Sequence, residues 1–231
     1  MLSFVSKYAY NELKAALGAV SEVIELDDNP NLRKPEAAHP DLQLFACGSD
    51  ILLAEGITTK AVNACRSSGY NIIFDKIGPD YPESARLDAA LCGNYLIHRL
   101  SVTSPYILNF ADKMHFVKLD VKQGYTGCRL VYIPRLDLAV TGDMGIYKAL
   151  RNNSFNAYLV DDEIIKRILL PGFGNGFLGG CTGYCSETDT LFVNGSFSGP
   201  LFELSQIIRQ SGTKIVETGG PLMDIGGIKF I

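Results

Sequence analysis

Short hydrophobic runs and amphipathic segments alternate along the chain in an order that repeats. The segment 51–74 shows the order: an apolar run, a loop of small residues, an amphipathic stretch, Ser-Ser-Gly, and a second apolar run. Short apolar runs bounded by turn residues are typical of buried strands, whereas longer stretches with apolar residues every three or four positions are typical of helices. The same order returns in 95–121, 138–160 and 191–217. The pattern therefore predicts four copies of a strand-helix-strand arrangement.

Each copy is preceded by another short apolar run and a turn. The run LQLFA is followed by Cys47-Gly48, and the run RLVYI is followed by Pro134-Arg135. Two apolar runs joined by such a turn predict a β-hairpin, so the full unit is strand, turn, strand, helix and strand. A doubly wound sheet would alternate strands with helices and would not place hairpins between the helices.

The two ends of the chain complement each other. Residues 2–26 read as a second strand, a helix and a third strand, and residues 222–231 read as a first strand alone. Together they predict a fifth unit whose completion leaves no exposed sheet edge between the first and last units. We therefore expect one α/β domain over residues 1–231, a pseudo-fivefold α/β-propeller of five ββαβ units closed by pairing of the N- and C-terminal segments.

Composition and charge narrow the function classes. Hydrophobic residues make up 47% of the chain and charged residues 20%, as in ordinary globular proteins. A net charge of -4 argues against nucleic acid and anionic membranes as main partners. The N-terminus lacks the features of a signal peptide, and no apolar stretch is long enough to span a membrane. Without an export signal, the six cysteines are expected to be reduced thiols, and the protein is expected to be cytoplasmic.

Polar residues stand near the start of each predicted first strand. In a ring of such units the first strands lie innermost, so these residues are expected to face a central channel. Unpaired aspartates are rarely buried, so this composition indicates a binding or catalytic site. The alternative is that each side chain only accepts hydrogen bonds from backbone amides at turns. The aligned residues are Asp41, Asp88, Cys128, Cys181 and Asp224.

The order of units, Pro40-Asp41 after the first linker, and the Gly-rich closing segment resemble the guanidino-group-modifying enzymes, the pentein fold. These include arginine and agmatine deiminases, amidinotransferases and dimethylarginine hydrolases. With its HPD, GGCTG and DIGG segments, the chain is most similar to a bacterial branch without a known activity. The resemblance implies a cysteine near the C-terminus that attacks the guanidinium carbon, a mid-chain histidine that relays protons, and carboxylates that hold the cation.

The sequence departs from that pattern at two places. Residues 228–231 follow the terminal glycines and contain no cysteine, and residues 125–129 contain no histidine. Only Asp41 and Asp224 carry over, as candidate carboxylates. A GxGxxG match at 174–179 is followed by more glycine instead of the helix that dinucleotide binding requires, so no such cofactor is expected.

Another set of residues could supply catalysis. Cys181 lies where glycines let a ligand approach the backbone, and His39 with Asp41 could assist it. Cys128 is the alternative nucleophile, and the other interpretation of Cys181 is a small buried hydrophobic residue. The Cys181–Cys185 pair lacks a second ligand cluster, so no metal site is expected. The residues expected to bind the ligand are Asp41, Asp88, Asp224, Cys128 and Arg129.

The residues are compatible with three functions. The first is a binder of a guanidino or amidine cation in the acidic central channel. The second is a thiol-dependent hydrolase acting on C–N bonds of amidines or amides through Cys181 or Cys128. The third is a protein-interaction module, by analogy with the ribosome anti-association factor that has a similar five-unit ring. The acidic channel and the missing terminal cysteine favour the first.

Overall fold

The computed structural model describes residues 1–197 and 199–231. Over these residues the fold is mixed α/β, with five three-stranded sheets. Within the described ranges, no helix combines the length and the apolar character needed to cross a membrane.

Four of the sheets are each built from one continuous segment of chain. In the first of these, β4 (Asp50–Ala54) is antiparallel to β3 (Leu44–Cys47) and parallel to β5 (Asn71–Asp75), and helix α3 (Thr59–Ser67) connects the parallel pair. The next three sheets have the same topology. Their elements are β6 (Ala90–Cys92), β7 (Tyr95–His98), α4 (Pro105–Lys113) and β8 (Val117–Asp120); β9 (Leu130–Ile133), β10 (Leu138–Thr141), α6 (Met144–Asn152) and β11 (Asn156–Leu159); and β12 (Thr182–Cys185), β13 (Thr190–Val193), α8 (Phe202–Gln210) and β14 (Lys214–Glu217).

The fifth sheet combines the two ends of the chain. Strand β1 (Leu2–Ser6) pairs in parallel with β2 (Glu22–Leu26) across helix α1 (Asn11–Gly18), and pairs antiparallel with β15 (Lys229–Phe230). The Leu2 backbone N–H donates to the Ile231 carbonyl at 2.8 Å, and the Ile231 N–H donates to the Leu2 carbonyl at 3.0 Å. The prediction that the two terminal segments share one unit is confirmed.

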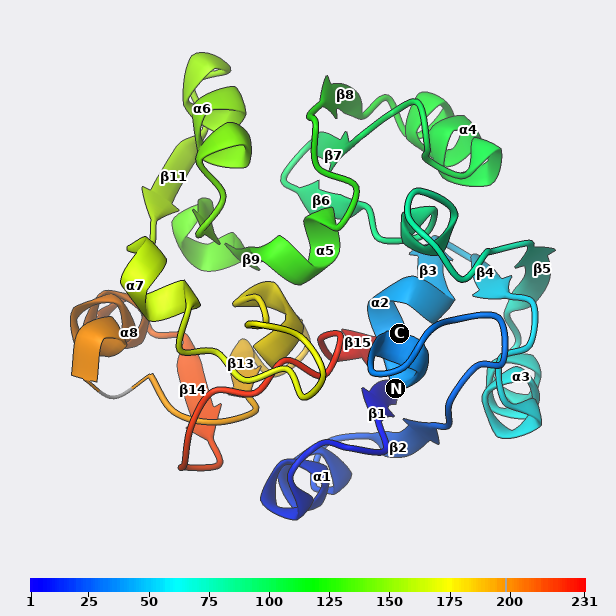
Figure 1. Cartoon of the computed structure of the whole chain (residues 1–231), viewed down its shortest axis with the longest axis horizontal. Helices are drawn as coiled ribbons and strands as arrows, with labels where there is room; N and C mark the ends of the chain where they lie inside the picture. Colours follow the sequence, from blue (N-terminus) through cyan, green and yellow to red (C-terminus); the bar gives the residue numbers. More distant parts are fainter. Residues whose placement is uncertain (198) are drawn as a thin grey trace.

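The five sheets follow one another around a common centre, and the long helices lie on the outside (Figure 1). Five clusters of buried hydrophobic residues, counted over the described ranges, each join two neighbouring sheets. One cluster contains Val5 of β1, Phe192 of β13 and Ile228 next to β15, so it connects the terminal sheet to its neighbour. Burial of this shared apolar surface, rather than strand pairing between sheets, holds the units together.

Short helical turns precede three of the inner strands, where the sequence predicted that the strands begin. These turns are α2 (Pro40–Gln43), α5 (Thr126–Arg129) and the 3-10 turn Gly179–Cys181. They place Asp41, Cys128 and Cys181 just before β3, β9 and β12, outside the strand ladders. The linkers between units also contain α7 (Asp162–Ile165) and the 3-10 turns Glu36–Ala38 and Glu83–Ala85, whereas the 3-10 turns Pro134–Leu136 and Gly199–Leu201 lie within units.

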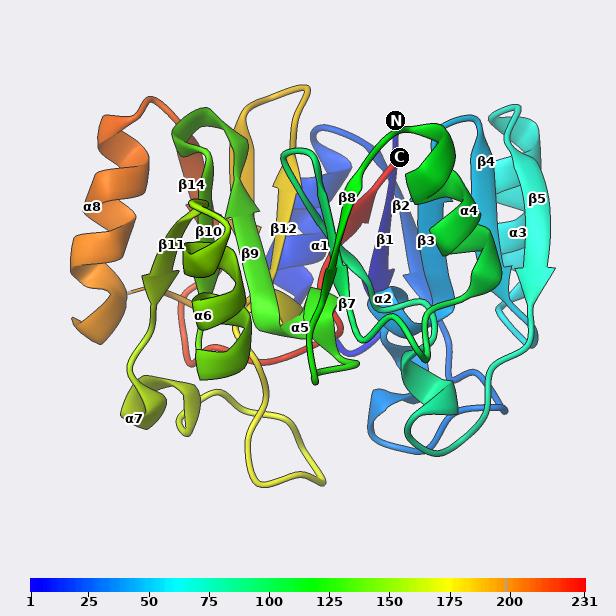
Figure 2. The ribbon, with the colours of Figure 1, turned by 90° about the horizontal axis from the view of Figure 1, so that it is seen from above.

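The linkers gather on one face of the molecule. Figure 2 shows the linker segments and α2, α5 and α7 below the sheets, with the two termini at the opposite side. The candidate functional site lies on this linker face.

Candidate functional site

Three of the five aligned residues meet at the centre. The Cys128 Sγ lies 2.7 Å from Asp41 Oδ2, and the Cys128 backbone N–H donates to Asp88 Oδ2 at 3.3 Å. All three side chains are buried, with at most 3% of the residue exposed. These three residues were expected to lie close together, and in the structure they are in direct contact. The segments just before β3, β6 and β9 bring them there.

Asp224 is held next to them by backbone donors. Its Oδ2 accepts a hydrogen bond from the Phe177 N–H at 2.8 Å, and its Oδ1 accepts one from the Gly226 N–H at 2.9 Å. A Cβ atom at Gly180 would overlap Asp224 Oδ1, and one at Gly127 would overlap Asp88 Oδ1. The two glycines are therefore required for the carboxylates to approach the backbone this closely.

The buried carboxylates at the centre have fewer hydrogen-bond partners than buried carboxylates need. Asp41 Oδ1 and Asp88 Oδ1 are buried and have no hydrogen-bond partner among the described residues. Burial raises the pKa of Asp41 well above its usual value, and the charge of Asp88 adds to this rise. Burial also raises the pKa of Asp88 to about 7 and that of Asp224 to about 6. A bound cation would relieve both the desolvation and the repulsion.

A cavity of about 190 Å³ lies against this cluster on the linker face. Its polar walls include Glu36, His39, Cys128 and Asp224. This volume is below the range of about 300–1,000 Å³ for drug-sized ligands, so the cavity suits a small molecule or one functional group of a larger one.

Aromatic side chains form much of the remaining wall. Tyr125, Phe173 and Phe177 line the cavity. The Tyr125 hydroxyl donates to Glu36 Oε1 at 3.4 Å and lies 2.8 Å from the Ser84 hydroxyl. Ring faces carry negative potential, so these walls favour a flat or cationic ligand.

Glu36 is a cavity residue that the sequence-based predictions missed. Burial raises its pKa, and the neighbouring charge of Asp224 raises it further. Two carboxylates from opposite ends of the chain thus face one cavity. The sequence signal that could have found Glu36 is its position three residues before His39. The turn Glu36–Ala38 brings the two residues to the same side, because the His39 N–H donates a hydrogen bond to the Glu36 carbonyl.

Arg129, an expected ligand-binding residue, is held by the chain's own groups. Its guanidinium carbon lies 3.8 Å from the centroid of the Phe177 ring, and its Nη1 lies 3.2 Å from Asp143 Oδ2. It forms part of the cavity wall. Its charge is paired by Asp143, so it only partly offsets the carboxylates.

His39 and Cys181, both expected to be catalytic, have different surroundings. His39 is buried, lines the cavity, and has no hydrogen bond to either ring nitrogen within the part of the chain that is described. Cys181 is fully buried in a hydrophobic cluster, donates from Sγ to the Phe177 carbonyl at 3.3 Å, and does not line the cavity. The structure thus places His39 and Asp41 beside Cys128 and leaves Cys181 in the core.

A second cavity of about 340 Å³ is lined by the inner strands. Its walls include Leu44, Ala90, Leu130, Thr182 and Lys229, one from each sheet. The positive charge of Lys229 lowers the pKa values of Asp41 and Asp88, against the larger effect of burial. Of the five residues expected to face a central channel, Cys128 and Asp224 line the cavity on the linker face, and none lines the cavity against the strands.

Comparison with known proteins gives a family and a distant structural neighbour. The neighbour is the crystal structure of a histidine-to-glycine variant of dimethylarginine dimethylaminohydrolase, as an adduct with S-methyl-L-thiocitrulline, with a TM-score of 0.42 and 9% sequence identity. The match covers 64% of this chain and 57% of that chain, so the chain spans little more than half of the enzyme's length. A search of curated proteins found no match. The model of a family of unknown function, DUF6873, matches residues 4–229, and the chain therefore belongs to this family.

Proposed function

We propose that this protein binds a small organic cation, a guanidino or amidine compound, in the cavity of the linker face. The observation that carries the proposal is the pair of carboxylates, Glu36 and Asp224, that lines a small cavity with aromatic walls. We propose further that residues 1–231 form one domain, an α/β-propeller of the guanidino-modifying type, and that the cavity lies at its hub.

The chemistry of the walls suits a planar cation. A guanidinium or amidinium group donates paired N–H bonds to carboxylates, and its flat faces stack on aromatic rings. The stacking of Arg129 on Phe177 is an example within the chain itself. In the proposed complex the head group lies between Glu36 and Asp224, with Asp41 and Asp88 adding negative potential from below.

Catalysis by Cys128 is the second candidate. The observation that favours it is the closeness of Cys128 to His39 and Asp41. Reactive cysteines, however, have pKa values lowered by positive neighbours or helix N-termini. Burial raises the pKa of Cys128 well above its usual value, and the charges of Asp41 and Asp88 raise it further. Binding without turnover is therefore the function that the geometry supports best.

Thermal melts with a matched pair of ligands test the proposal. Benzamidine and benzamide differ in charge but hardly in shape, so only benzamidine should raise the Tm. Agmatine and guanidinium extend the panel. The stabilisation should follow ligand linkage, about 2.7 kcal/mol at a concentration about a hundred times Kd.

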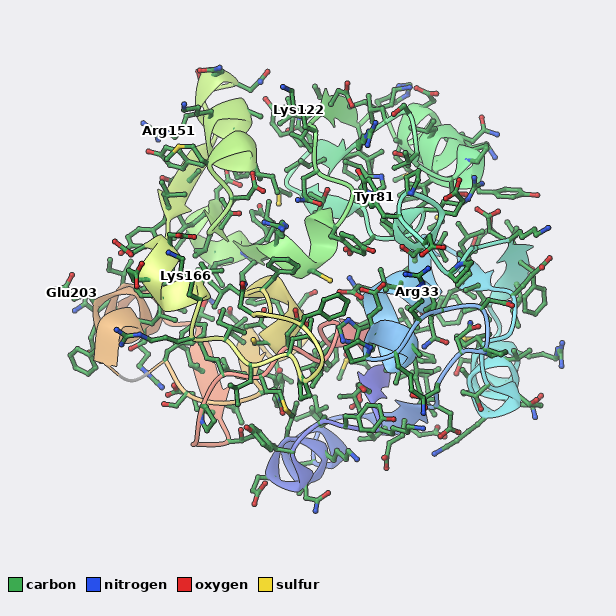
Figure 3. All side chains as sticks on the ribbon, in the orientation of Figure 1. Arg33, Tyr81, Lys122, Arg151, Lys166 and Glu203 are labelled. Atoms are coloured by element: carbon green, nitrogen blue, oxygen red, sulfur yellow. The ribbon has the colours of Figure 1, made fainter. Side chains whose placement is uncertain are left out.

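Variants localise the effect. Glu36→Gln should abolish the shift, and Asp41→Asn should weaken it. Glu203→Gln is the matched control, because Glu203 is exposed on α8 at the outer edge of the molecule (Figure 3). Equal shifts with benzamide, or an undiminished shift in Glu36→Gln, would contradict cation binding in this cavity. Steady production of ammonia or urea from agmatine would favour the thiol hydrolase.

A further inference from the structure

Three different kinds of metal-binding side chain meet beneath the cavity. A ring nitrogen of His39, a carboxylate oxygen of Asp41 and the Sγ of Cys128 all lie within 4.8 Å of one another. His39 and Asp41 lie two positions apart at the start of one turn, and Cys128 comes from another turn two units further along the chain. The fold itself, and not a local sequence motif, creates this group.

Several atoms of the group lack the partners that buried polar atoms normally have. Among the described residues, neither ring nitrogen of His39, which lines the cavity, has a hydrogen bond, and Asp41 Oδ1 is buried without a partner. Asp88 Oδ1, on the carboxylate that accepts from the Cys128 N–H, is also buried and unpartnered within those residues. Buried polar and charged groups in folded proteins are hydrogen-bonded, paired or bound to metal ions. The unpartnered acceptors therefore indicate a positively charged ligand.

The chemistry of the three donors selects the class of ion. A thiolate does not suit Mg²⁺ or Ca²⁺, which prefer all-oxygen sites, whereas a mixed set of sulfur, nitrogen and oxygen is typical of Zn²⁺. Tetrahedral Zn²⁺ places such donors about 3.3–3.7 Å apart, given metal–ligand distances of about 2.0–2.3 Å. The Sγ to Oδ2 separation of 2.7 Å is shorter than this, so these two atoms would move apart by less than about 1 Å on binding the ion.

We propose that His39, Asp41 and Cys128 bind a Zn²⁺ ion, with the fourth coordination position open toward the cavity. His39 and Cys128 both line that cavity, which gives the ion a path from solvent. Three protein ligands and one open position are the arrangement of zinc sites that bind a water molecule or a substrate. Asp88 orients the group through its bond to the Cys128 backbone. The metal site shares Asp41 with the proposed cation site but does not use Glu36. Variants of Glu36 therefore separate the failure of one proposal from the failure of the other.

Cobalt substitution tests the site directly. The full-length protein, treated with a chelator and then kept reduced, is titrated with Co²⁺ alone. Thiolate coordination should produce a sulfur-to-cobalt charge-transfer band in the near ultraviolet that saturates at one ion per chain and disappears on addition of Zn²⁺. Glu36→Gln should retain the band, which separates this test from that of cation binding.

Two variants assign the ligands. Cys128→Ser should lose the charge-transfer band, and His39→Gln should weaken Co²⁺ binding at least tenfold. Cys47→Ser is the control, because Cys47 is half-buried at the end of β3, lines a different cavity, and should leave the band unchanged. Absence of the band in the wild type, or its persistence in Cys128→Ser, would overturn the proposal. If Cys128→Ser fails to fold, the wild-type titration and His39→Gln decide the question.

Discussion

The Cys128 thiol lies 2.7 Å from the Asp41 carboxylate although the two residues are 87 positions apart in the sequence. Both are buried, and neither faces a lysine or arginine at hydrogen-bond distance among the described residues. Such a contact is unfavourable unless protons or a cation are shared within it. It therefore connects the fold to the two ligands that we propose, an organic cation above the contact and a metal ion within it.

The first prediction concerns the glycine beneath Asp88. Gly127→Ala should destabilise the protein by about 1–3 kcal/mol, because the new Cβ overlaps Asp88 Oδ1 and forces the buried cluster to shift. Gly18→Ala at the end of α1 is the control, since its Cβ would meet no atom within 4 Å. Urea denaturation of both variants measures the difference. Equal urea midpoints for Gly127→Ala and Gly18→Ala would show that the buried carboxylates can shift without loss of stability.

The second prediction concerns the contact between the terminal sheet and its neighbour. Ile228→Ala should lower the free energy of unfolding by about 2–4 kcal/mol, because Ile228 is 4% exposed and packs with Val5 and Phe192. Ile207→Ala, at an exposed position of α8, should change it by less than about 1 kcal/mol. Comparable losses from the two variants would mean that this cluster contributes little to closure.

The third prediction separates two roles of Asp224. Asp224→Asn should cost about 1–3 kcal/mol, because an amide offers only one oxygen to the two backbone donors, Phe177 N–H and Gly226 N–H. Asp162→Asn on the exposed helix α7 should be nearly neutral. The measurement is again the free energy of unfolding. A neutral Asp224→Asn would show that the two backbone hydrogen bonds to the carboxylate contribute little to stability.

The fourth prediction concerns pH. His98 is fully buried, lies 2.7 Å from the Thr103 hydroxyl, and lies 2.6 Å from the Gly124 carbonyl. Burial lowers its pKa to about 4, against weaker opposing effects of the backbone carbonyls and of Asp120. The ordinary pKa of histidine is about 6.5. Between about pH 4 and pH 6.5, His98 therefore binds a proton in the unfolded chain but not in the folded chain. Stability due to His98 is therefore present above about pH 6.5 and is lost as the pH falls toward 4.

The difference between wild type and His98→Gln isolates this effect. Both proteins contain the carboxylates with raised pKa values, whose protonation acts in the opposite direction. The free energy of unfolding of the wild type, relative to His98→Gln, should fall by about 1.4 kcal/mol per pH unit between about pH 6 and pH 4.5. Parallel stability curves for the two proteins would show that His98 titrates alike in both states.

Much of the fold could be predicted because its signals are local. Hydrophobic runs and turn residues define each hairpin, helix and strand, and the incomplete units at residues 2–26 and 222–231 indicated their pairing. The register of the inner strands also brought Asp41, Asp88 and Cys128 together correctly. The turns α2 and α5 were missed because four residues are too few to show helical periodicity.

The rest of the candidate site depends on contacts that no local pattern encodes. Glu36 belongs to a linker whose path over the centre is fixed by packing, and its role follows only from Asp224 at the other end of the chain. The group of His39, Asp41 and Cys128 has no motif spacing, so the sequence indicated no metal site. The glycines next to Cys181 are compatible with access of a ligand and equally with tight packing in the core. In the structure they pack tightly, and Cys181 is fully buried.

The pairing of β1 with β15 has a consequence for synthesis in the cell. Translation proceeds from the N-terminus, so β1 and β2 emerge from the ribosome long before β15 and before Asp224. A nascent chain that stops short of residue 224 has an open strand edge on β1 and also lacks one carboxylate of the cavity. Completion of the sheet and completion of the cavity thus coincide, and a prematurely terminated product would be prone to aggregation and would lack one of the two carboxylates that we propose hold the organic cation.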